Sequence, residues 1–201
     1  MKTGTLEWGV AAAPLPGETE CGDRHVVQAF DGGVLVAVID AIGHGAQAAR
    51  IAGLAAGVLG QQPAEPVRAL LWRCHERLRG SRGAAISIAS FDDRTSTMAW
   101  LGVGNVHGVV VRAGVLPQPR RDSLLVRGGM VGDRLPELEL TEIPVAGGDM
   151  LIMATDGVAS DFREVLPGTL EPQQLAERIE RGYAGTSDDS LVLVARYTGA
   201  P

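Results

Sequence analysis

Three aspartates stand beside apolar runs that have the character of strands. Asp40 follows the run VLVAVI, Asp156 follows MLIMAT, and Asp188 belongs to the Asp-Asp pair that leads into SLVLVA. A carboxylate at the tip of a rigid strand is held stiffly enough to bind a metal ion or to make a catalytic contact. Aspartate is also common in ordinary turns, so any one of these positions alone is a weak signal. Together, with no lysine or arginine next to any of the three, they predict a site for hard divalent cations such as Mg²⁺ or Mn²⁺.

A fourth carboxylate, Asp23, is brought to the same place by a predicted hairpin. The sequence Asp31-Gly32-Gly33 is a turn signal of the Asp-Gly kind, and strand-like segments lie on either side of it at 25–30 and 34–39. An antiparallel return through this turn carries Asp23 back to the level of Asp40. We therefore expect carboxylates that are distant in the sequence to share one end of a sheet.

Length and composition predict one core and exclude several classes of partner. The 201 residues are 45% hydrophobic, with a formal charge of −6. A chain of this size buries roughly 70% of its unfolded surface in one core, so we expect a single, monomeric domain over residues 1–201. The acidic balance lacks the clustered positive charge that nucleic-acid and anionic-membrane binders need.

Cysteine usage and the N-terminal segment predict a cytoplasmic protein. Cys21 and Cys74 form no CxxC pair, so neither a zinc site nor a disulfide framework is indicated. The first residues lack a basic start followed by a long apolar core, and no apolar run approaches the ~20 residues that cross a bilayer.

The elements expected to position these residues come in groups. Strand patterns are predicted at 3–13, 25–30, 34–39, 84–91, 97–103, 107–112, 150–154 and 190–196, and helical patterns at 46–61, 65–79 and 172–182. The helices are bunched in two places instead of following every strand. This grouping favours an α+β fold of antiparallel sheets over a parallel doubly wound fold.

The region 114–144 is rich in proline, glycine and arginine and predicts a loop over the sheet, with one brief strand at 124–127. Five arginines crowd this region and its border: Arg112, Arg120, Arg121, Arg127 and Arg134. Two interpretations stay open. The arginines belong either to a solvated loop or to a surface that docks an acidic phosphoprotein.

Three segments resemble a known family when they are taken together. DAIGHG, TDGV and DDSLVLV, in this order and spacing, look like the signature segments of the metal-dependent phosphoserine/phosphothreonine phosphatases of type 2C. The likeness spans residues 20–195 and points to the small bacterial subgroup exemplified by SpoIIE and RsbX. The length, with no sensor domain attached, is most similar to the stressosome phosphatase RsbX.

This resemblance implies a fold, a cofactor and a reaction. The fold would be an αββα sandwich of two antiparallel sheets flanked by helices, with two Mn²⁺ or Mg²⁺ ions at one end. By motif position, Asp40 would bridge both ions, Asp156 and Asp188 would complete one of them, and the carbonyl of Ala41 would contact the other. Asp23 would reach an ion through a bound water, or would support a residue that binds the ion directly. The implied reaction is attack of a metal-activated water on the phosphoryl group.

The size of the barrier agrees with a metal mechanism. Hydrolysis of phosphate monoesters needs accelerations up to ~10²¹, whereas one general acid or base supplies only ~10²–10⁴. His44, beside the predicted site, is a candidate to protonate the seryl leaving group. Its alternative is a turn histidine hydrogen-bonded to backbone. Asn105 is likewise either a turn former or a substrate contact.

Two departures from the family pattern bear on the site. Many relatives have glycine where this chain has Ala41, and an alanine forced to positive φ would cost about 1 kcal/mol or more. Larger relatives also carry a phosphate-holding arginine ahead of the acidic segment. The stretch 15–20 has none here, and Arg24 is the nearest substitute.

The resemblance also implies partners, and two rival functions stay open. The implied substrates are phosphorylated bacterial regulatory proteins of the STAS type, including stressosome scaffold proteins. One rival is a catalytically silent phosphatase fold that only binds phosphoproteins. The other is a dinucleotide-binding enzyme, because residues 43–48 fit G-x-G-x-x-A between a strand and a helix.

Overall fold

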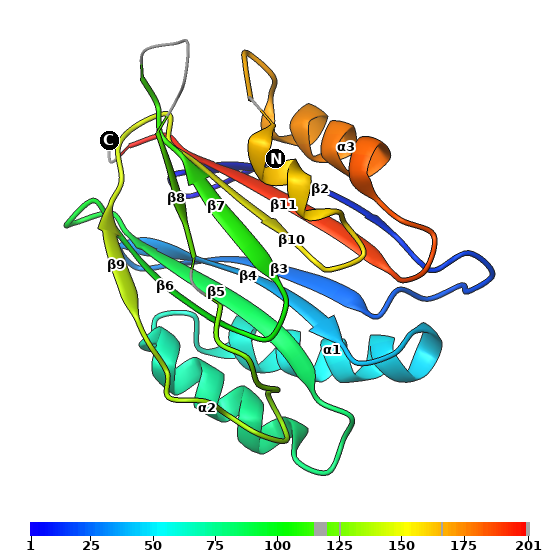
Figure 1. Ribbon diagram of the computed structural model, residues 1–201. Coiled ribbons are helices and arrows are strands. Elements are labelled where there is room, and N and C mark those ends of the chain that lie inside the picture. The colour runs from blue at the N-terminus through cyan, green and yellow to red at the C-terminus, as the bar shows by residue number, and fades with distance from the viewer. Residues whose placement is uncertain (115–119, 125, 166, 200–201) are drawn as a thin grey trace.

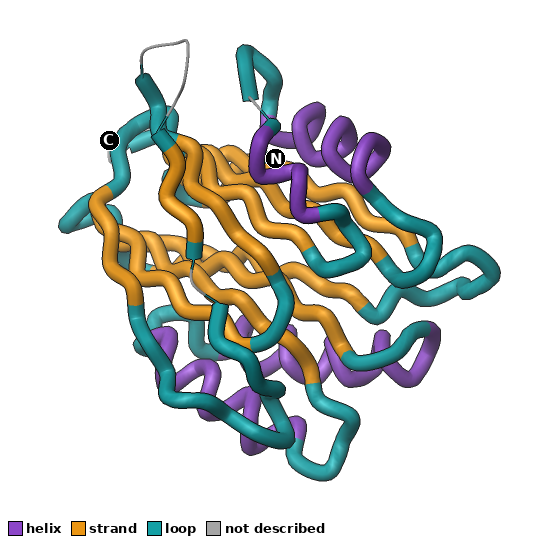
Figure 2. Tube along the Cα trace, viewed as in Figure 1, coloured by secondary structure: helices purple, strands orange, loops and turns teal. Residues whose placement is uncertain are grey.

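The computed structural model describes residues 1–114, 120–124, 126–165 and 167–199. Its strands form two antiparallel sheets packed face to face, and helices cover both outer faces (Figures 1 and 2). This arrangement confirms the predicted α+β class and the αββα order of layers.

Each sheet combines segments from distant parts of the chain. The first sheet has the order β1 (Lys2–Thr3), β2 (Leu6–Ala13), β11 (Ser190–Tyr197), β10 (Met150–Ala154), β7 (His107–Val111) and β8 (Arg121–Ser123). The second has the order β3 (Asp23–Phe30), β4 (Gly33–Ala41), β5 (Ala84–Asp92), β6 (Thr97–Val103) and β9 (Thr141–Pro144). The two halves of the predicted carboxylate set therefore lie on different sheets.

The helices form the outer layers. The second sheet is covered by α1 (Gly45–Gln61) and α2 (Val67–Leu78), and the first by α3 (Pro172–Tyr183) and the short 3₁₀ helix η1 (Ser160–Glu164) (Figure 1). None of the helices in the described part of the chain is long and apolar enough to cross a bilayer.

Strand β4 shows why the sequence favours this layering. Val34, Val36 and Val38 belong to the core between the two sheets, whereas Leu35 and Ile39 belong to the core beneath α1 and α2. Both faces of the strand are buried, so its sequence is an unbroken apolar run instead of an alternating one. Such a strand is fixed from both sides, which makes its end a rigid support for Asp40.

The pairing of β4 rules out the dinucleotide-binding alternative. It runs antiparallel to both of its neighbours, β3 and β5. A dinucleotide-binding unit requires parallel strands joined by a crossover helix. The glycine-rich turn at 43–48 therefore serves a different purpose.

The 114–144 region contains more structure than the sequence predicted. The brief strand expected at 124–127 is wrong: the strand here is β8, at Arg121–Ser123, and Arg127 makes only an isolated bridge to Val103. Strand β9 was not predicted either. Residues 115–119 and 125 of the predicted loop lie outside the described residues.

Candidate metal centre

Asp23 and Asp40 face each other across two hydrogen-bonded strands. They are direct partners in the antiparallel register of β3 and β4, as the predicted hairpin requires. Like charges placed directly opposite on neighbouring strands destabilise a sheet. The pair therefore needs protons or a cation between the two carboxylates.

Asp156 and Asp188 approach the same edge from the other sheet. Strands β10 and β11 pair so that Ala154 lies opposite Val192, Asp156 follows the end of β10, and Asp188 precedes β11. The Asp156 carboxylate lies within hydrogen-bonding reach of Asp40. The structure thus brings together all four aspartates predicted from the sequence.

The electrostatics of the group favour a bound cation. Burial, together with the smaller effects of the charges of Asp23, Asp156 and Asp188, raises the pKa of Asp40 to about 8. Burial also raises the pKa of Asp23 to about 7, against the opposing effect of a hydrogen bond from Thr155. None of the ion pairs between described residues involves these four aspartates. Their negative charge is therefore uncompensated by protein cations.

The four carboxylates form an edge and not a closed cage. Within residues 1–114, 120–124, 126–165 and 167–199, no three acidic, histidine or cysteine side chains converge tightly enough to enclose an ion. Their mutual pKa effects show that they are neighbours all the same. An open set of oxygen ligands fits Mg²⁺-like ions, which keep several waters and bind through one or two carboxylates plus substrate phosphate.

Ala41 adopts an ordinary strand conformation. It ends β4, and its N–H donates to the Gly22 carbonyl oxygen at 3.3 Å. The only described residue other than glycine with positive φ is Ser96. Alanine at position 41 therefore carries no backbone penalty.

Thr155 and Asn105 hold two of the carboxylates in place. The Thr155 hydroxyl is fully buried, donates to Asp23 at 2.7 Å and accepts the Leu191 N–H at 2.9 Å. The Asn105 side-chain amide donates to Asp156 at 2.5 Å. Sequence reasoning missed Thr155, although a polar residue closing a buried run was a signal. Asn105 is more than a turn former.

Comparison with known proteins agrees with this geometry. Residues 31–198 match the family model described as Stage II sporulation protein E (SpoIIE). The chain belongs to the SpoIIE family. It is thereby a member of the type 2C phosphatase class that the three motifs predicted.

Individual relatives of this SpoIIE-family protein agree with the assignment. "Phosphoserine phosphatase RsbX" from Bacillus subtilis (strain 168) is 23% identical over 183 residues, which cover 90% of this chain and 89% of that protein. A crystal structure of RsbX in complex with magnesium has a TM-score of 0.85 at 20% identity, covering 98% of this chain and 97% of the other. A structure described as "The bacterial stressosome: a modular system that has been adapted to control secondary messenger signaling" also has a TM-score of 0.85, at 29% identity and 95% and 99% coverage.

The two aspartates of the Asp188-Asp189 pair differ in burial and in their contacts. Asp188 is exposed at the edge, whereas Asp189 is buried and accepts the N–H groups of Leu15 and Gly22, each at 2.7 Å. Asp189 therefore ties the start of β11 to the segment that leads into β3. The sequence alone does not distinguish the two neighbours.

His44 is held by a carboxylate, so the alternative of a backbone-bonded turn histidine is wrong. Its Nδ1 lies 2.6 Å from Glu18 Oε1. An ionised carboxylate only accepts hydrogen bonds, so Nδ1 carries a proton and Nε2 is the nitrogen that Glu18 leaves free. Both side chains are partly exposed, beside the start of α1.

Arg82 is a cationic residue near the site that sequence reasoning missed. It lies in the connection between α2 and β5, and a Cβ built on Gly43 would stand 2.9 Å from its Nη1. Gly43 has φ of +95°, so a side chain there is disfavoured both by backbone conformation and by the guanidinium. An N–H from Ile42 to the Gly83 carbonyl oxygen, at 3.1 Å, holds the two loops together. Ion pairs among the described residues do not include Arg82.

The arginines of the 114–144 region lie at two ends of the molecule. Arg121 pairs with Val111 at one end of β7, whereas His107 at the other end pairs with Ala154, next to the aspartates. Four strand residues at roughly 3.4 Å each separate these ends by about 14 Å. Arg127, which bridges Val103 and pairs with Glu139, is nearer the aspartate edge.

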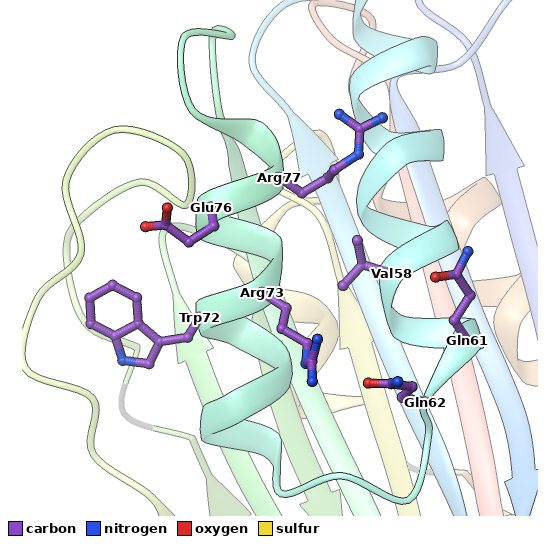
Figure 3. A pocket seen from close by; sticks show the side chains of 7 residues that line it. All are labelled: Val58, Gln61, Gln62, Trp72, Arg73, Glu76 and Arg77. Atoms are coloured by element: carbon purple, nitrogen blue, oxygen red, sulfur yellow. The ribbon is translucent and has the colours of Figure 1, made fainter.

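A separate hollow lies on the helical layer. It has a volume of about 610 Å³ between α1 and α2, and its lining includes Val58, Trp72, Arg73 and Arg77 (Figure 3). The Arg73 guanidinium is paired with Glu65. None of the predicted site residues lines this hollow, so it is not the metal centre.

Proposed function

We propose that this protein is a metal-dependent phosphoserine/phosphothreonine protein phosphatase. Its proposed substrates are phosphorylated regulatory proteins of the STAS or stressosome type in the bacterial cytoplasm. The observation that carries the proposal is the group of Asp23, Asp40, Asp156 and Asp188, four carboxylates from two sheets that form no ion pair with any of the described residues. The printed name of the RsbX relative supports phosphoserine as the target.

The aspartates are the proposed ligands of two Mn²⁺ or Mg²⁺ ions. Asp40 would serve both ions, Asp156 and Asp188 would hold one of them, and the Ala41 carbonyl would contact the other. Such a metal pair supplies an acidified water nucleophile and neutralises charge on the reacting phosphate. Thr155 fixes Asp23 and Asn105 fixes Asp156 by the hydrogen bonds described above. These contacts hold the ligands in one arrangement before substrate arrives.

His44 and Arg82 are proposed to act on the substrate side of the edge. Glu18 orients the His44 ring through Nδ1 and leaves Nε2 free, so that the imidazolium form would donate the Nε2 proton to the seryl leaving oxygen. Arg82 is our candidate for the residue that holds the phosphoryl oxygens. A guanidinium binds a phosphate with two parallel hydrogen bonds, and Arg82 already rests on the loop that carries His44.

The test is hydrolysis of an aryl phosphate and of a phosphorylated STAS protein by the purified chain in Mn²⁺, in Mg²⁺ and in excess EDTA. We expect turnover of both substrates with metal and none with chelator. Arg82→Ala should raise KM for the phosphoprotein more than Arg24→Ala, which tests the substitute that the sequence suggested.

Two results would contradict the proposal. Full turnover in EDTA, with no metal found by elemental analysis, removes the metal mechanism. Tight Mn²⁺ binding and phosphoprotein binding without any turnover identify the chain as the silent binding module instead.

A further inference from the structure

A second, smaller hollow adjoins the aspartate edge. It has a volume of about 330 Å³ and is lined by Ile42, Ala85, Asn105, Met130 and three glycines, Gly104 among them. We call it the Ile42 hollow. It lies next to the candidate metal centre, because its lining residue Asn105 donates to Asp156 and Ile42 is the second residue after Asp40.

The Ile42 hollow is apolar and uncharged. No acidic or basic side chain lines it, and Asn105 is its one polar side chain. Ile42 is 37% exposed and is one of three large apolar residues that the described part of the chain exposes, with Met1 and Trp72. Covering an exposed apolar side chain at the rim of such a hollow removes apolar surface from water, which favours binding of a partner there.

Backbone hydrogen bonds hold the walls of the Ile42 hollow. Ala84 and Val131 exchange N–H to carbonyl bonds at 3.0 and 2.9 Å, which fixes Met130 beside β5. The Met130 N–H donates to the Arg134 carbonyl oxygen at 2.8 Å. The Met130 side chain also packs against Gly83, where a Cβ would lie 2.6 Å from its Cγ. The cavity is therefore built before any ligand arrives, as binding pockets usually are.

We infer that the Ile42 hollow receives an apolar side chain of the substrate protein, one or two positions from the phosphorylated residue. This inference rests on the proposed phosphatase function. Two residues of chain reach about 7 Å, and Ile42 is two residues from Asp40, so a substrate whose phosphate lies at the aspartates places its near neighbour over the hollow. The lining favours leucine, isoleucine, valine or methionine. It disfavours aspartate and glutamate, which would lose hydration without gaining a partner.

The test uses the purified full chain with Mn²⁺ and a set of phosphoserine peptides. The peptides differ only at the two positions on each side of the phosphoserine, which carry leucine, alanine or aspartate in turn. At one of the four positions we expect kcat/KM to be about tenfold higher for leucine than for alanine, with aspartate lowest. Aryl phosphate turnover serves as the reference for the chemistry of the metal centre.

Variants assign that preference to the hollow. Ile42→Asn and, separately, Met130→Gln should reduce the leucine preference towards unity while aryl phosphate turnover stays within twofold. The matched control is Trp72→Asn, an exposed apolar residue on α2 outside the Ile42 hollow, which should keep the preference. Circular dichroism and unfolding curves check that each variant is folded.

The outcomes separate this inference from the proposed function. Activity on aryl phosphate and peptides without any preference for leucine overturns the inference and leaves the phosphatase proposal standing. A leucine preference that survives in both hollow variants also overturns it. Absence of metal-dependent turnover on every substrate overturns both.

Discussion

Two clusters of acidic residues lie at opposite ends of the β-sandwich, and they differ in whether arginine pairs with their carboxylates. At the end formed by Val111 and Met150, Asp149 is 4% exposed, and Arg112 donates to it at 2.8 Å. At the other end Asp23 is also 4% exposed, yet no arginine or lysine of the described residues pairs with it.

The hydrogen bonds of the two buried aspartates point to different uses. Asp149 also accepts the N–H groups of Ala113 and Ala146, at 2.7 and 3.1 Å, so its charge is satisfied by the protein. Asp23 accepts one hydroxyl, from Thr155, and burial raises its pKa to about 7. A buried aspartate is structural where an arginine pairs with it, as at Asp149, and is available to bind a ligand where no arginine pairs with it, as at Asp23. The five predictions below test this contrast, from the largest expected effect to the smallest.

Asp40→Asn should remove nearly all metal-dependent turnover, a loss of about a thousandfold or more, because the proposed bridging ligand serves both ions. The protein should stay folded, and in EDTA its Tm should equal or exceed that of the unaltered protein, because the variant lacks the buried carboxyl whose raised pKa of about 8 opposes folding. Steady-state assays with aryl phosphate and thermal unfolding measure both effects. Retained turnover in Asp40→Asn would show that this end is not the metal centre.

Asp149→Asn, at the other end of the sandwich, should lower stability and leave turnover nearly unchanged. The exchange leaves the Arg112 guanidinium without one of its charged partners, so we expect a loss of about 2–3 kcal/mol in the free energy of unfolding and little change in kcat. Urea denaturation measures the stability, with Asp31→Asn as the control. Asp31 pairs with Arg94 but is 99% exposed, so its loss should be close to neutral. A large loss of kcat in folded Asp149→Asn would contradict the interpretation that Asp149 is a structural residue and not part of the active site.

Asp23→Asn should have an intermediate effect. As a residue that acts through water or through a ligand, it should weaken Mn²⁺ affinity by about 10–100-fold, with activity recovered at high metal concentration. Titration of activity against free Mn²⁺ measures the shift. A loss equal to that of Asp40→Asn would make Asp23 a direct ligand of the same rank.

Stability in EDTA should fall as pH rises from about 5 to 8. The pKa values of Asp23 and Asp40 rise from 3.8 to about 7 and about 8 in the folded protein. Between these limits the folded state holds more protons than the unfolded chain, so raising the pH favours unfolding. Thermal unfolding across this range measures the slope, and Asp40→Asn should flatten it. Saturating Mn²⁺ should also flatten it, because metal binding needs deprotonated carboxylates. A slope of opposite sign in EDTA would contradict the interpretation that Asp23 and Asp40 have raised pKa values.

The smallest effect is expected for the double variant Arg120→Ala/Arg121→Ala. Arg120 is 83% exposed, and Arg121 pairs with the exposed Glu164 at 3.4 Å. We expect about 0.5 kcal/mol or less in stability and unchanged turnover of both aryl phosphate and phosphoprotein. The sequence had suggested these arginines for docking the partner, and slower phosphoprotein turnover alone would restore that interpretation.

Sequence reasoning succeeded where the chain has strong local patterns. The apolar runs and the Asp31-Gly32-Gly33 turn predicted β3, β4, β10 and β11, and with them the meeting of the four aspartates. It failed in the 114–144 region because β8 and β9 have three and four residues, too few to show alternation. Short edge strands are defined by their neighbours and not by their own sequence.

The residues that support the site were harder to predict than the ligands. Thr155 acts through a hydrogen bond to Asp23, which is 132 positions away in the sequence. Arg82 lies near Gly43, although α1 and α2 separate the two residues in the sequence. Neither residue belongs to a local motif. Asp188 and Asp189 share one motif, but Asp188 is exposed and Asp189 is buried, a difference set by the contact of Asp189 with the segment before β3.

The distribution of the aspartates over two sheets links cation binding to the assembly of the sandwich. Asp23 and Asp40 come from one sheet and Asp156 and Asp188 from the other, so each sheet alone carries only half of the aspartates of the proposed metal centre. A cation held by both halves acts as a clamp across the interface, and at a concentration of 100 times its Kd it would add about 2.7 kcal/mol to stability. By the same linkage, a displacement of one sheet relative to the other that separates the two pairs of aspartates would weaken cation affinity. Metal affinity would therefore report on how the two sheets are packed together.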